Sequence, residues 1–219
     1  MYKVYQKLTE TPLPGDWDSE AINKSTTFTR IIKLAVEKSK KLGTGSSRVA
    51  FEVSDPGFEN TVIKVAKNKK GLLQNELEGE IMSLGWYKDQ VPKLLDIDQD
   101  SQIYKREGQP LWLQVERARK PKPSEINTFL GLKDVNNFRR YLSKIFGRYN
   151  TSEFNEDFKI LDNNEWMQEL IHMIGDFDLA WQDIPVIRNL GFVGDTLKVI
   201  DVGASNNIIK TYYHKGNLL

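Results

Sequence analysis

A glycine-rich stretch near the start of the chain has the residue types needed to bind phosphate. Residues 42–53 read LGTGSSRVAFEV, with Gly43 and Gly45 close together, Ser46 next to them and apolar alternation after them. Backbone N–H groups at such glycines can approach phosphate oxygens because no side chain intervenes. The same glycines could instead serve a tight turn that uses their freedom in φ. No helix opens after them and no Gly-Lys-Ser/Thr follows, which excludes a dinucleotide fingerprint and a Walker loop here.

A lysine inside an apolar strand is the second candidate. Lys64 lies in VIKVA, on the same predicted strand face as Val62 and Ala66, where an ammonium group needs an anionic partner. The alternative is a lysine that extends off a half-exposed sheet into water. The next predicted helix offers three carboxylates as partners: Glu76, Glu78 and Glu80.

Polar residues flank the last predicted hairpin. Asn189 precedes its first strand and Asp201 follows its second, and an antiparallel hairpin brings these flanks to the same open end. An amide oxygen and a carboxylate there can converge on a hard cation such as Mg²⁺. Asp183 is the remaining acid close by, and Gly203 would allow a sharp turn after DVG. A strand that simply ends in a turn explains DVG equally well.

The elements that must position these residues follow from hydrophobic periodicity. Apolar residues at helical spacing predict a helix over 28–36 and another over 71–84, with an apolar stripe on Leu73, Leu77 and Leu84. Alternation and turn residues predict a hairpin. The predicted strands are 48–53, 61–66, 91–98 and 110–118.

A proline-containing segment, RKPKPSE at 119–125, marks the best domain boundary because its prolines fit neither a strand nor a helix interior. Helical spacing predicts helices around 138–146 and 166–177, the second capped by Asn163 or Asn164, and a final hairpin over 190–200. We therefore expect a lead-in segment over 1–24 with irregular structure, a sheet-containing part over 25–118 and a helical part over 119–219.

Composition excludes several classes of function. The 219 residues include 31 Lys and Arg against 30 Asp and Glu, so no global charge favours nucleic acid or a membrane surface. The absence of cysteine excludes disulfides and thiolate chemistry, and two histidines exclude a His-rich metal site. No stretch approaches the ~18 apolar residues of a membrane span, and no signal-peptide pattern opens the chain. These features predict a cytoplasmic protein.

In their order along the chain, these features resemble the protein-kinase-like superfamily. LGTGSSRVAFEV is similar to its glycine-rich loop, VIKVA to its Val-Ala-Ile-Lys strand, and the helix over 71–84 to its helix C. LQVERA resembles its hinge, DIPVIRN its catalytic loop and VIDVG its Asp-Phe-Gly segment. The resemblance covers about residues 40–205. The spelling of the loop and lysine strand is most similar to small kinase-like proteins encoded by bacteriophages.

The resemblance implies an α+β, two-lobed protein-kinase-like fold, with a small antiparallel sheet in the N-lobe and a reduced, mostly helical C-lobe. It implies ATP and Mg²⁺ as cofactors, with Gly43, Gly45 and Ser46 at the phosphates and the backbone of 116–118, Glu116 and Ala118 included, at adenine. Lys64 would hold the phosphates and pair with Glu78, or with Glu80 as the rival. Asn189 and Asp201 would bind Mg²⁺, and Asp183 would accept the proton of the attacking hydroxyl.

Three departures from the family pattern bear on activity. Arg48 stands where the loop has its third glycine. No His-Arg-Asp triplet exists, and Ile184 occupies the position of the catalytic aspartate, one residue after Asp183. The sequence also ends soon after Gly203, and we therefore expect neither an activation segment nor a large platform that holds peptides.

Three functions follow from this pattern. The first is an ATP- and Mg²⁺-dependent phosphotransferase acting on Ser or Thr hydroxyls of proteins. The second is a pseudokinase that acts as a protein-interaction or inhibitor module. The third is a kinase of small molecules. All require that Lys64 and Asp201 face one cleft if nucleotide is bound; the first two imply a protein substrate or partner, and none implies a membrane or nucleic acid.

Overall fold

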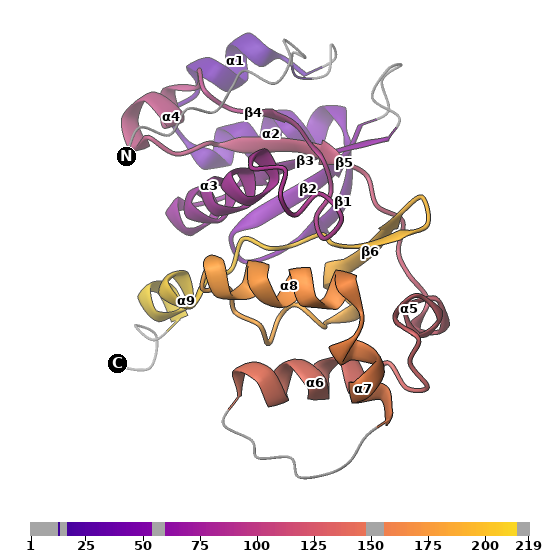
Figure 1. The fold of residues 1–219 in the computed structure, drawn as a ribbon. Helices are drawn as coiled ribbons and strands as arrows, with labels where there is room; N and C mark the ends of the chain where they lie inside the picture. The colour runs from indigo at the N-terminus through magenta and orange to yellow at the C-terminus, as the bar shows by residue number, and fades with distance from the viewer. Residues whose placement is uncertain (1–12, 14–16, 54–59, 148–155, 214–219) are drawn as a thin grey trace. The chain divides into compact units, whose positions relative to one another are not determined.

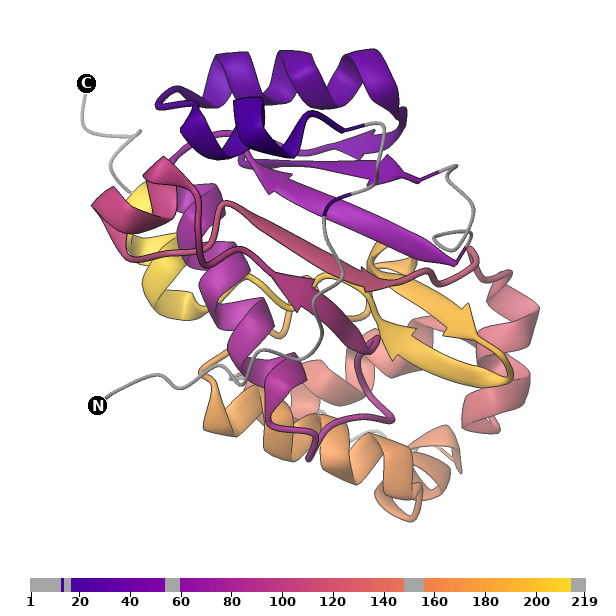
Figure 2. The ribbon, with the colours of Figure 1, turned by 90° about the horizontal axis from the view of Figure 1, so that it is seen from above.

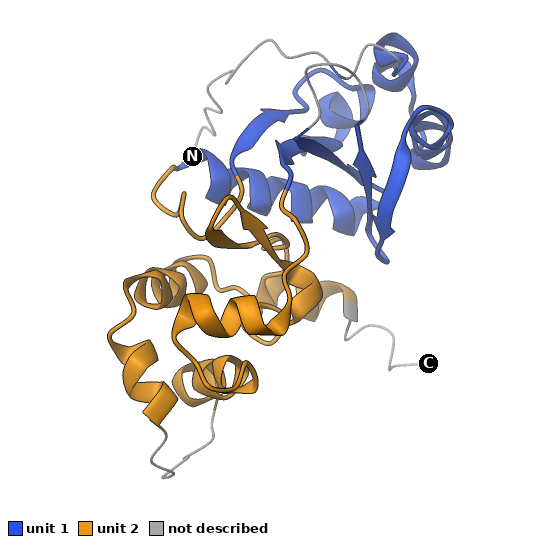
Figure 3. Cartoon of the chain, turned by 90° about the vertical axis from the view of Figure 1, so that its right-hand side faces the viewer, with its two compact units in different colours: residues 1–84, 93–117 blue, residues 85–92, 118–219 orange. Residues whose placement is uncertain are grey.

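The computed structural model describes Leu13 and residues 17–53, 60–147 and 156–213 (Figure 1). The chain divides into two compact units, each described by itself below (Figure 3). Unit 1 comprises residues 1–84 and 93–117, and unit 2 comprises residues 85–92 and 118–219. Most of the predicted lead-in, residues 1–12 and 14–16, lies outside the described residues.

Unit 1 is built on a five-stranded antiparallel sheet with the order β1-β2-β3-β5-β4. The predicted hairpin is confirmed, since Ala50 of β2 pairs with Lys64 of β3. The edge strand β1 was missed because all five of its residues are exposed and show no apolar alternation. The strands are β1 Lys40–Thr44, β2 Arg48–Glu52, β3 Thr61–Ala66, β4 Leu94–Ile97 and β5 Trp112–Glu116.

Two N-terminal helices, α1 (Ser19–Lys24) and α2 (Phe28–Lys38), pack on one side of this sheet (Figure 2). Trp17 stacks edge-on against Phe51 of β2, with ring centroids 5.5 Å apart. The expectation of irregular structure up to residue 24 is wrong here. Asp18 caps α1 by accepting a hydrogen bond from the Ala21 N–H at 2.8 Å, and Ile22 of α1 is buried in the core.

Helix α3 (Lys69–Ser83) follows β3 and packs against β3, β4 and β5. Asn68 caps it, and its first turn continues directly from the strand. The predicted stripe on Leu73, Leu77 and Leu84 is wrong: Leu84 is 39% exposed and not the centre of a buried face. The buried face mixes apolar residues with polar ones: Gln74, Asn75 and Glu78 are buried there because they meet polar partners from β2 and the 45–47 loop. A short helix, α4 (Gln102–Glu107), lies between β4 and β5.

Unit 2 consists of helices around a two-stranded hairpin. The predicted Asn164 cap is confirmed, as its side chain accepts a hydrogen bond from the Met167 N–H at 3.0 Å. The predicted hairpin is also confirmed, with Leu190 paired to Val199 and a turn at Gly194, whose φ is +57°. The elements are α5 Pro123–Leu130, α6 Asn136–Phe146, α7 Glu156–Asp162, α8 Glu165–Asp176, a 3-10 turn Ile187–Asn189, β6 Leu190–Val193, β7 Thr196–Val199 and α9 Asn206–Tyr213.

The segment over 85–92 groups with unit 2, although we expected it in the sheet-containing part. Hydrogen bonds explain the grouping. The Trp166 indole N–H lies 2.9 Å from the Asp89 carbonyl oxygen, and the Val199 N–H donates to the Gln90 carbonyl at 2.7 Å. The Tyr87 hydroxyl donates to Asp176 at 2.5 Å. Across the described ranges of both units, no helix has the length and apolar character needed to cross a bilayer.

Candidate functional site

Gly45 begins the loop over 45–47 between β1 and β2, and Gly43 lies in β1 itself; turn geometry explains neither glycine. The Gly45 N–H donates to the Arg48 carbonyl at 2.9 Å. Neither Gly43 nor Gly45 has φ in the left-handed region. A Cβ at Gly43 would meet no described atom within 4 Å, and one at Gly45 would lie 3.8 Å from the Arg48 carbonyl oxygen. The explanation through freedom in φ is therefore wrong, and the Cβ position of Gly43 borders open space.

The loop is fastened to the beginning of α3. The Asn68 side-chain N–H donates to the Ser46 carbonyl at 3.1 Å, and the Lys70 ammonium lies 3.4 Å from the Ser46 hydroxyl. The buried Ser47 hydroxyl donates to the Gln74 side chain. Because these contacts come from the cap and first turns of one helix, the position of the loop is set by α3.

Lys64 forms an ion pair with Glu78, which links strand β3 to helix α3. Lys64 lies on β3, and its ammonium contacts Glu78 Oε1. Its side chain is 11% exposed, whereas the Glu78 side chain is fully buried. Of the two glutamates weighed from the sequence, Glu78 and not Glu80 makes this ion pair. A buried carboxylate needs such partners, because removing an ion from water is costly unless opposite charge and hydrogen bonds replace the solvent.

Arg48 is a second cation on the same carboxylate, which sequence reasoning missed. Its Nη1 lies 2.7 Å from Glu78 Oε2 and 3.3 Å from the Asn75 side-chain oxygen. The Asn75 amide N–H in turn donates to the Leu111 carbonyl of the sheet unit at 2.9 Å. A signal for this contact was available in principle. Arg48 pairs with Ala66 across β2 and β3, and Lys64 lies two residues from Ala66, so Arg48 and Lys64 share one face of the sheet.

The segment over 116–118 has most of its backbone donors engaged within unit 1. The Glu116 N–H donates to the Lys93 carbonyl at 2.9 Å, and the Arg117 N–H to the Asn60 carbonyl at 2.7 Å. The described hydrogen bonds leave the Ala118 N–H unused. The Arg117 side chain contacts Glu52 at 2.5 Å. The pKa of Glu52 is lowered, first by a hydrogen bond from Lys40 and then by Arg117, against the opposing effect of burial.

In unit 2, the hairpin brings Asn189 and Asp201 to its open end. After the Leu190–Val199 pair, the Ile200 N–H donates to the Asn189 carbonyl at 2.8 Å, which places Asp201 one residue beyond that bond. The Asn189 side-chain N–H donates to the Asp183 carbonyl at 2.8 Å, which directs its amide oxygen away from that carbonyl. Asp183, Asn189 and Asp201 are half-buried, whereas Ile184 is 2% exposed.

The side-chain oxygens of Asn189 and Asp201 suit a Mg²⁺ ion that is also bound by phosphate. Magnesium is commonly bound through one or two carboxylates together with substrate phosphates and water. Asn189 and Asp201 supply an amide oxygen and a carboxylate, which suit that mode. Within the described parts of the chain, no group of three or more His, Asp or Glu side chains is arranged to hold a metal by itself.

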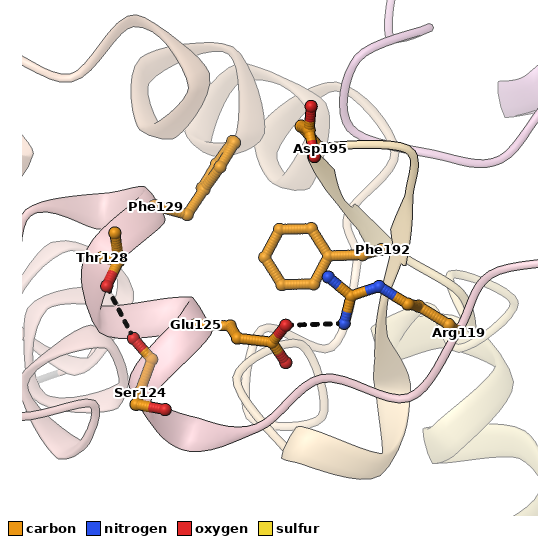
Figure 4. Close-up of a pocket in the computed structure, with 7 residues that line it drawn as sticks. All are labelled: Arg119, Ser124, Glu125, Thr128, Phe129, Phe192 and Asp195. Carbon is orange, nitrogen blue, oxygen red and sulfur yellow. Dashed lines mark hydrogen bonds and ion pairs between the residues drawn. The ribbon is translucent and has the colours of Figure 1, made fainter.

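Unit 2 also contains a pocket of about 310 Å³ that none of the predicted site residues lines (Figure 4). The Arg119 guanidinium lies 4.8 Å from the centroid of the Phe192 ring and 2.8 Å from Glu125. A hydrogen bond from the Lys122 N–H and the nearby Arg119 lower the pKa of Glu125. The other lining residues are Ser124, Thr128, Phe129 and Asp195.

Topology defines the class of fold. The structure has the α+β fold expected from the kinase-like resemblance. Its sheet is antiparallel with the order β1-β2-β3-β5-β4, and α3, between β3 and β4, carries the glutamate that pairs with Lys64 of β3. Its second unit is helical and contains a hairpin. The predicted fold class is thus confirmed.

Comparisons with known proteins add a structural likeness. No protein-family model matches the chain, and no curated protein matches it in sequence. Among solved structures, the chain is similar to the GDP and kanamycin complex of APH(2")-IIia, with 16% identity and a TM-score of 0.37. The match covers 75% of this chain and 66% of that chain, so it spans just under two thirds of the solved structure.

Proposed function

We propose that the chain is an ATP- and Mg²⁺-dependent phosphotransferase of the protein-kinase type. The observation that carries the proposal is the buried Lys64–Glu78 pair, formed by a lysine in the third strand and a glutamate on the helix that follows it. This pairing is the arrangement that positions a lysine for nucleotide phosphates in kinases. Gly43 of β1 and Gly45 of the 45–47 loop support the proposal, because neither has a positive φ and an added Cβ would make no close contact at either.

Each predicted residue has a role in this proposal. Lys64 binds phosphate oxygens, held by Glu78. The backbone at Gly43, Gly45 and Ser46 faces the phosphates, and the unused Ala118 N–H, beside Glu116, meets the adenine edge. Asn189 and Asp201 hold Mg²⁺, which would neutralise charge on the phosphates when bound. The proposal requires that Lys64 and Asp201 face a common cleft.

Asp183 is the proposed base. A substrate hydroxyl oxygen would attack the terminal phosphorus of ATP, its proton would pass to the Asp183 carboxylate, and ADP would leave. Support comes from the 2.8 Å bond between the Asn189 amide and the Asp183 carbonyl, which ties the base to the metal ligand. Little covalent chemistry is asked of the protein, because phosphoryl transfer depends mainly on positioning and charge neutralisation.

The first experiment measures thermal stability with ATP, with and without Mg²⁺. Nucleotide at 100 times its Kd adds about 2.7 kcal/mol of stability. We expect this gain in the wild type and its loss in Lys64→Met and Asp201→Asn. The matched controls are Lys69→Met, whose lysine is 68% exposed, and Asp195→Asn at the closed end of the same hairpin. If the controls lose the gain as fully as the site variants, nucleotide binds elsewhere.

The second experiment measures transfer. Labelled ATP is incubated with a cell extract and either wild type or Asp201→Ala, and we expect labelled proteins only with the wild type. Equal labelling with both, or none with either, would contradict a protein kinase. A parallel screen of hydroxyl-bearing metabolites tests the kinase of small molecules.

A pseudokinase that acts as an interaction or inhibitor module is the second candidate. Two observations favour it: Ile184 is buried at the family position of the catalytic aspartate, and Arg48 replaces the third glycine. This function requires stoichiometric binding of one protein that is unaffected by Lys64→Met. A melting temperature insensitive to ATP and Mg²⁺ would separate it from the phosphotransferase.

A further inference from the structure

Two cations share one buried carboxylate in unit 1, and each takes a different oxygen. Arg48 Nη1 lies 2.7 Å from Glu78 Oε2, and the Lys64 ammonium contacts Glu78 Oε1. The exposed fractions are 10% for Arg48, 11% for Lys64 and 0% for Glu78. The three side chains therefore interact in an environment where little water screens them.

We propose that Arg48 is a positioning residue for phosphate binding: by engaging Oε2 of Glu78, it keeps Lys64 from being held by both carboxylate oxygens. The inference rests on the proposed nucleotide function. With Oε2 engaged by Arg48, the contact between Lys64 and Glu78 runs through Oε1. The single negative charge of Glu78 is also shared by two positive charges. Arg48 therefore weakens the hold of Glu78 on Lys64, and this favours attraction of an anion to the ammonium group.

Arginine suits this task because its position is fixed from several sides. Its planar guanidinium also lies 3.3 Å from the Asn75 side-chain oxygen, and Asn75 is fully buried. Asn75 donates in turn to the carbonyls of Pro110 and Leu111 at 3.2 and 2.9 Å. A guanidinium held in this network keeps the carboxylate plane of Glu78 in one orientation.

The place of Arg48 in the chain joins this ion network to the glycine loop. Arg48 begins β2 directly after residues 45–47. The Lys67 N–H donates to the Ser47 carbonyl at 2.7 Å, and the Lys67 ammonium lies 2.8 Å from the Gly45 carbonyl. The loop, Arg48 and the start of α3 therefore form one connected piece, and the loop keeps a fixed position relative to the Lys64–Glu78 pair.

A comparison of ATP with adenosine tests the inference, because adenosine lacks phosphates. In Arg48→Met we expect ATP to bind about tenfold more weakly in the presence of Mg²⁺, within the range for groups of one ionic network, with adenosine binding unchanged. Arg48→Lys keeps a cation near Oε2 and should restore most of the ATP affinity. Arg106→Met, whose arginine is half-exposed beside Glu107, is the control and should change neither affinity. Equal weakening of ATP and adenosine would show that Arg48 only shapes the loop and would overturn the inference.

A ligand-free measurement separates this inference from the proposed function. Urea unfolding of Lys64→Met, Glu78→Gln and the double variant gives the coupling between Lys64 and Glu78. Charge sharing predicts that this coupling, as a factor in the unfolding equilibrium constant, is severalfold larger in the Arg48→Met background. An unchanged or smaller coupling would overturn the inference. If the wild type binds no ATP, the proposed function fails. The Lys64–Glu78 coupling measured by unfolding then tests by itself whether Arg48 and Lys64 share the charge of Glu78.

Discussion

Replacing Glu78 by glutamine tests the ionic network that the candidate site depends on. The substitution keeps the size of the side chain and removes the charge that Arg48 and Lys64 share. Removing one partner of a buried ion pair typically costs 3–5 kcal/mol, because the remaining charge stays buried. Glu78 has no exposed surface, while its two partners are 10% and 11% exposed. The glutamine amide oxygen can still accept one hydrogen bond, so we expect a loss of about 3 kcal/mol, at the lower end of that range.

Urea unfolding followed by tryptophan fluorescence measures this loss, since Trp17 and Trp112 are buried in unit 1. The unfolding midpoint should fall without a change in the slope of free energy against urea. In a thermal scan, 3 kcal/mol corresponds to roughly 6–12 °C for a protein of 219 residues.

Glu80→Gln is the matched control, on the same helix and outside the Lys64–Glu78–Arg48 contacts. We expect it to lose much less stability than Glu78→Gln. A loss in Glu78→Gln no larger than that in the control would refute the reasoning, because the two cations would then gain nothing from this carboxylate.

Three further predictions follow from the geometry. Gly43→Ala should leave the urea midpoint unchanged or slightly raised, since a Cβ there meets no described atom within 4 Å, while ATP affinity falls; an unchanged ATP affinity would remove the loop from the phosphate site. Gly71→Ala should cost about 1–3 kcal/mol in the same urea assay, because its Cβ would collide with the Ser47 carbonyl; a neutral result would show that the loop is not held against α3. Burial and a hydrogen bond to Asp176 raise the pKa of Tyr87 to about 12, against an ordinary value of 10.0. Between pH 10 and 12 the folded protein therefore keeps a proton that the unfolded chain releases, and the free energy of unfolding falls as the pH rises through this range. Tyr87→Phe should make this fall less steep, and the fall that remains comes from Tyr141, whose pKa is also raised to about 12. A profile of stability against pH as steep as that of the wild type would contradict the assignment of the fall to Tyr87.

The elements that could be predicted from the sequence are those with a clear apolar period. The α2 and α8 helices, the β2–β3 hairpin and the final hairpin all bury alternate or helically spaced apolar residues. The edge strand β1 has no such pattern because every residue in it is exposed. The helix α1 is too short for periodicity to show, and its start depends on the Asp18 cap.

Single residues of the candidate site could be predicted from the sequence, but their ionic contacts could not. Lys64 could be identified because a lysine at a buried strand position needs an anion. Choosing between Glu78 and Glu80 required the rotational position of α3, and the apolar stripe gave it wrongly, because the helix buries polar residues. Arg48 was noted only as a departure from a glycine pattern, although the pairing of β2 with β3 places it on the same sheet face as Lys64. Its contact with Glu78 depends on three segments meeting, which no local pattern encodes.

The composition of the buried α3 face argues that the ionic network serves chemistry more than stability. A helix packed on a sheet gains most from apolar contacts, yet α3 buries Gln74, Asn75 and Glu78 there. Replacing a complete buried ion network by apolar residues of similar size is often neutral, or stabilising by about 1–4 kcal/mol, since no ion then has to leave water. The loss expected when Glu78 alone is changed reflects the charges left behind and not a net benefit of having three charges. Stability therefore gives no reason for a lysine at this point of β3, whereas the proposed binding of an anionic phosphate group would give one.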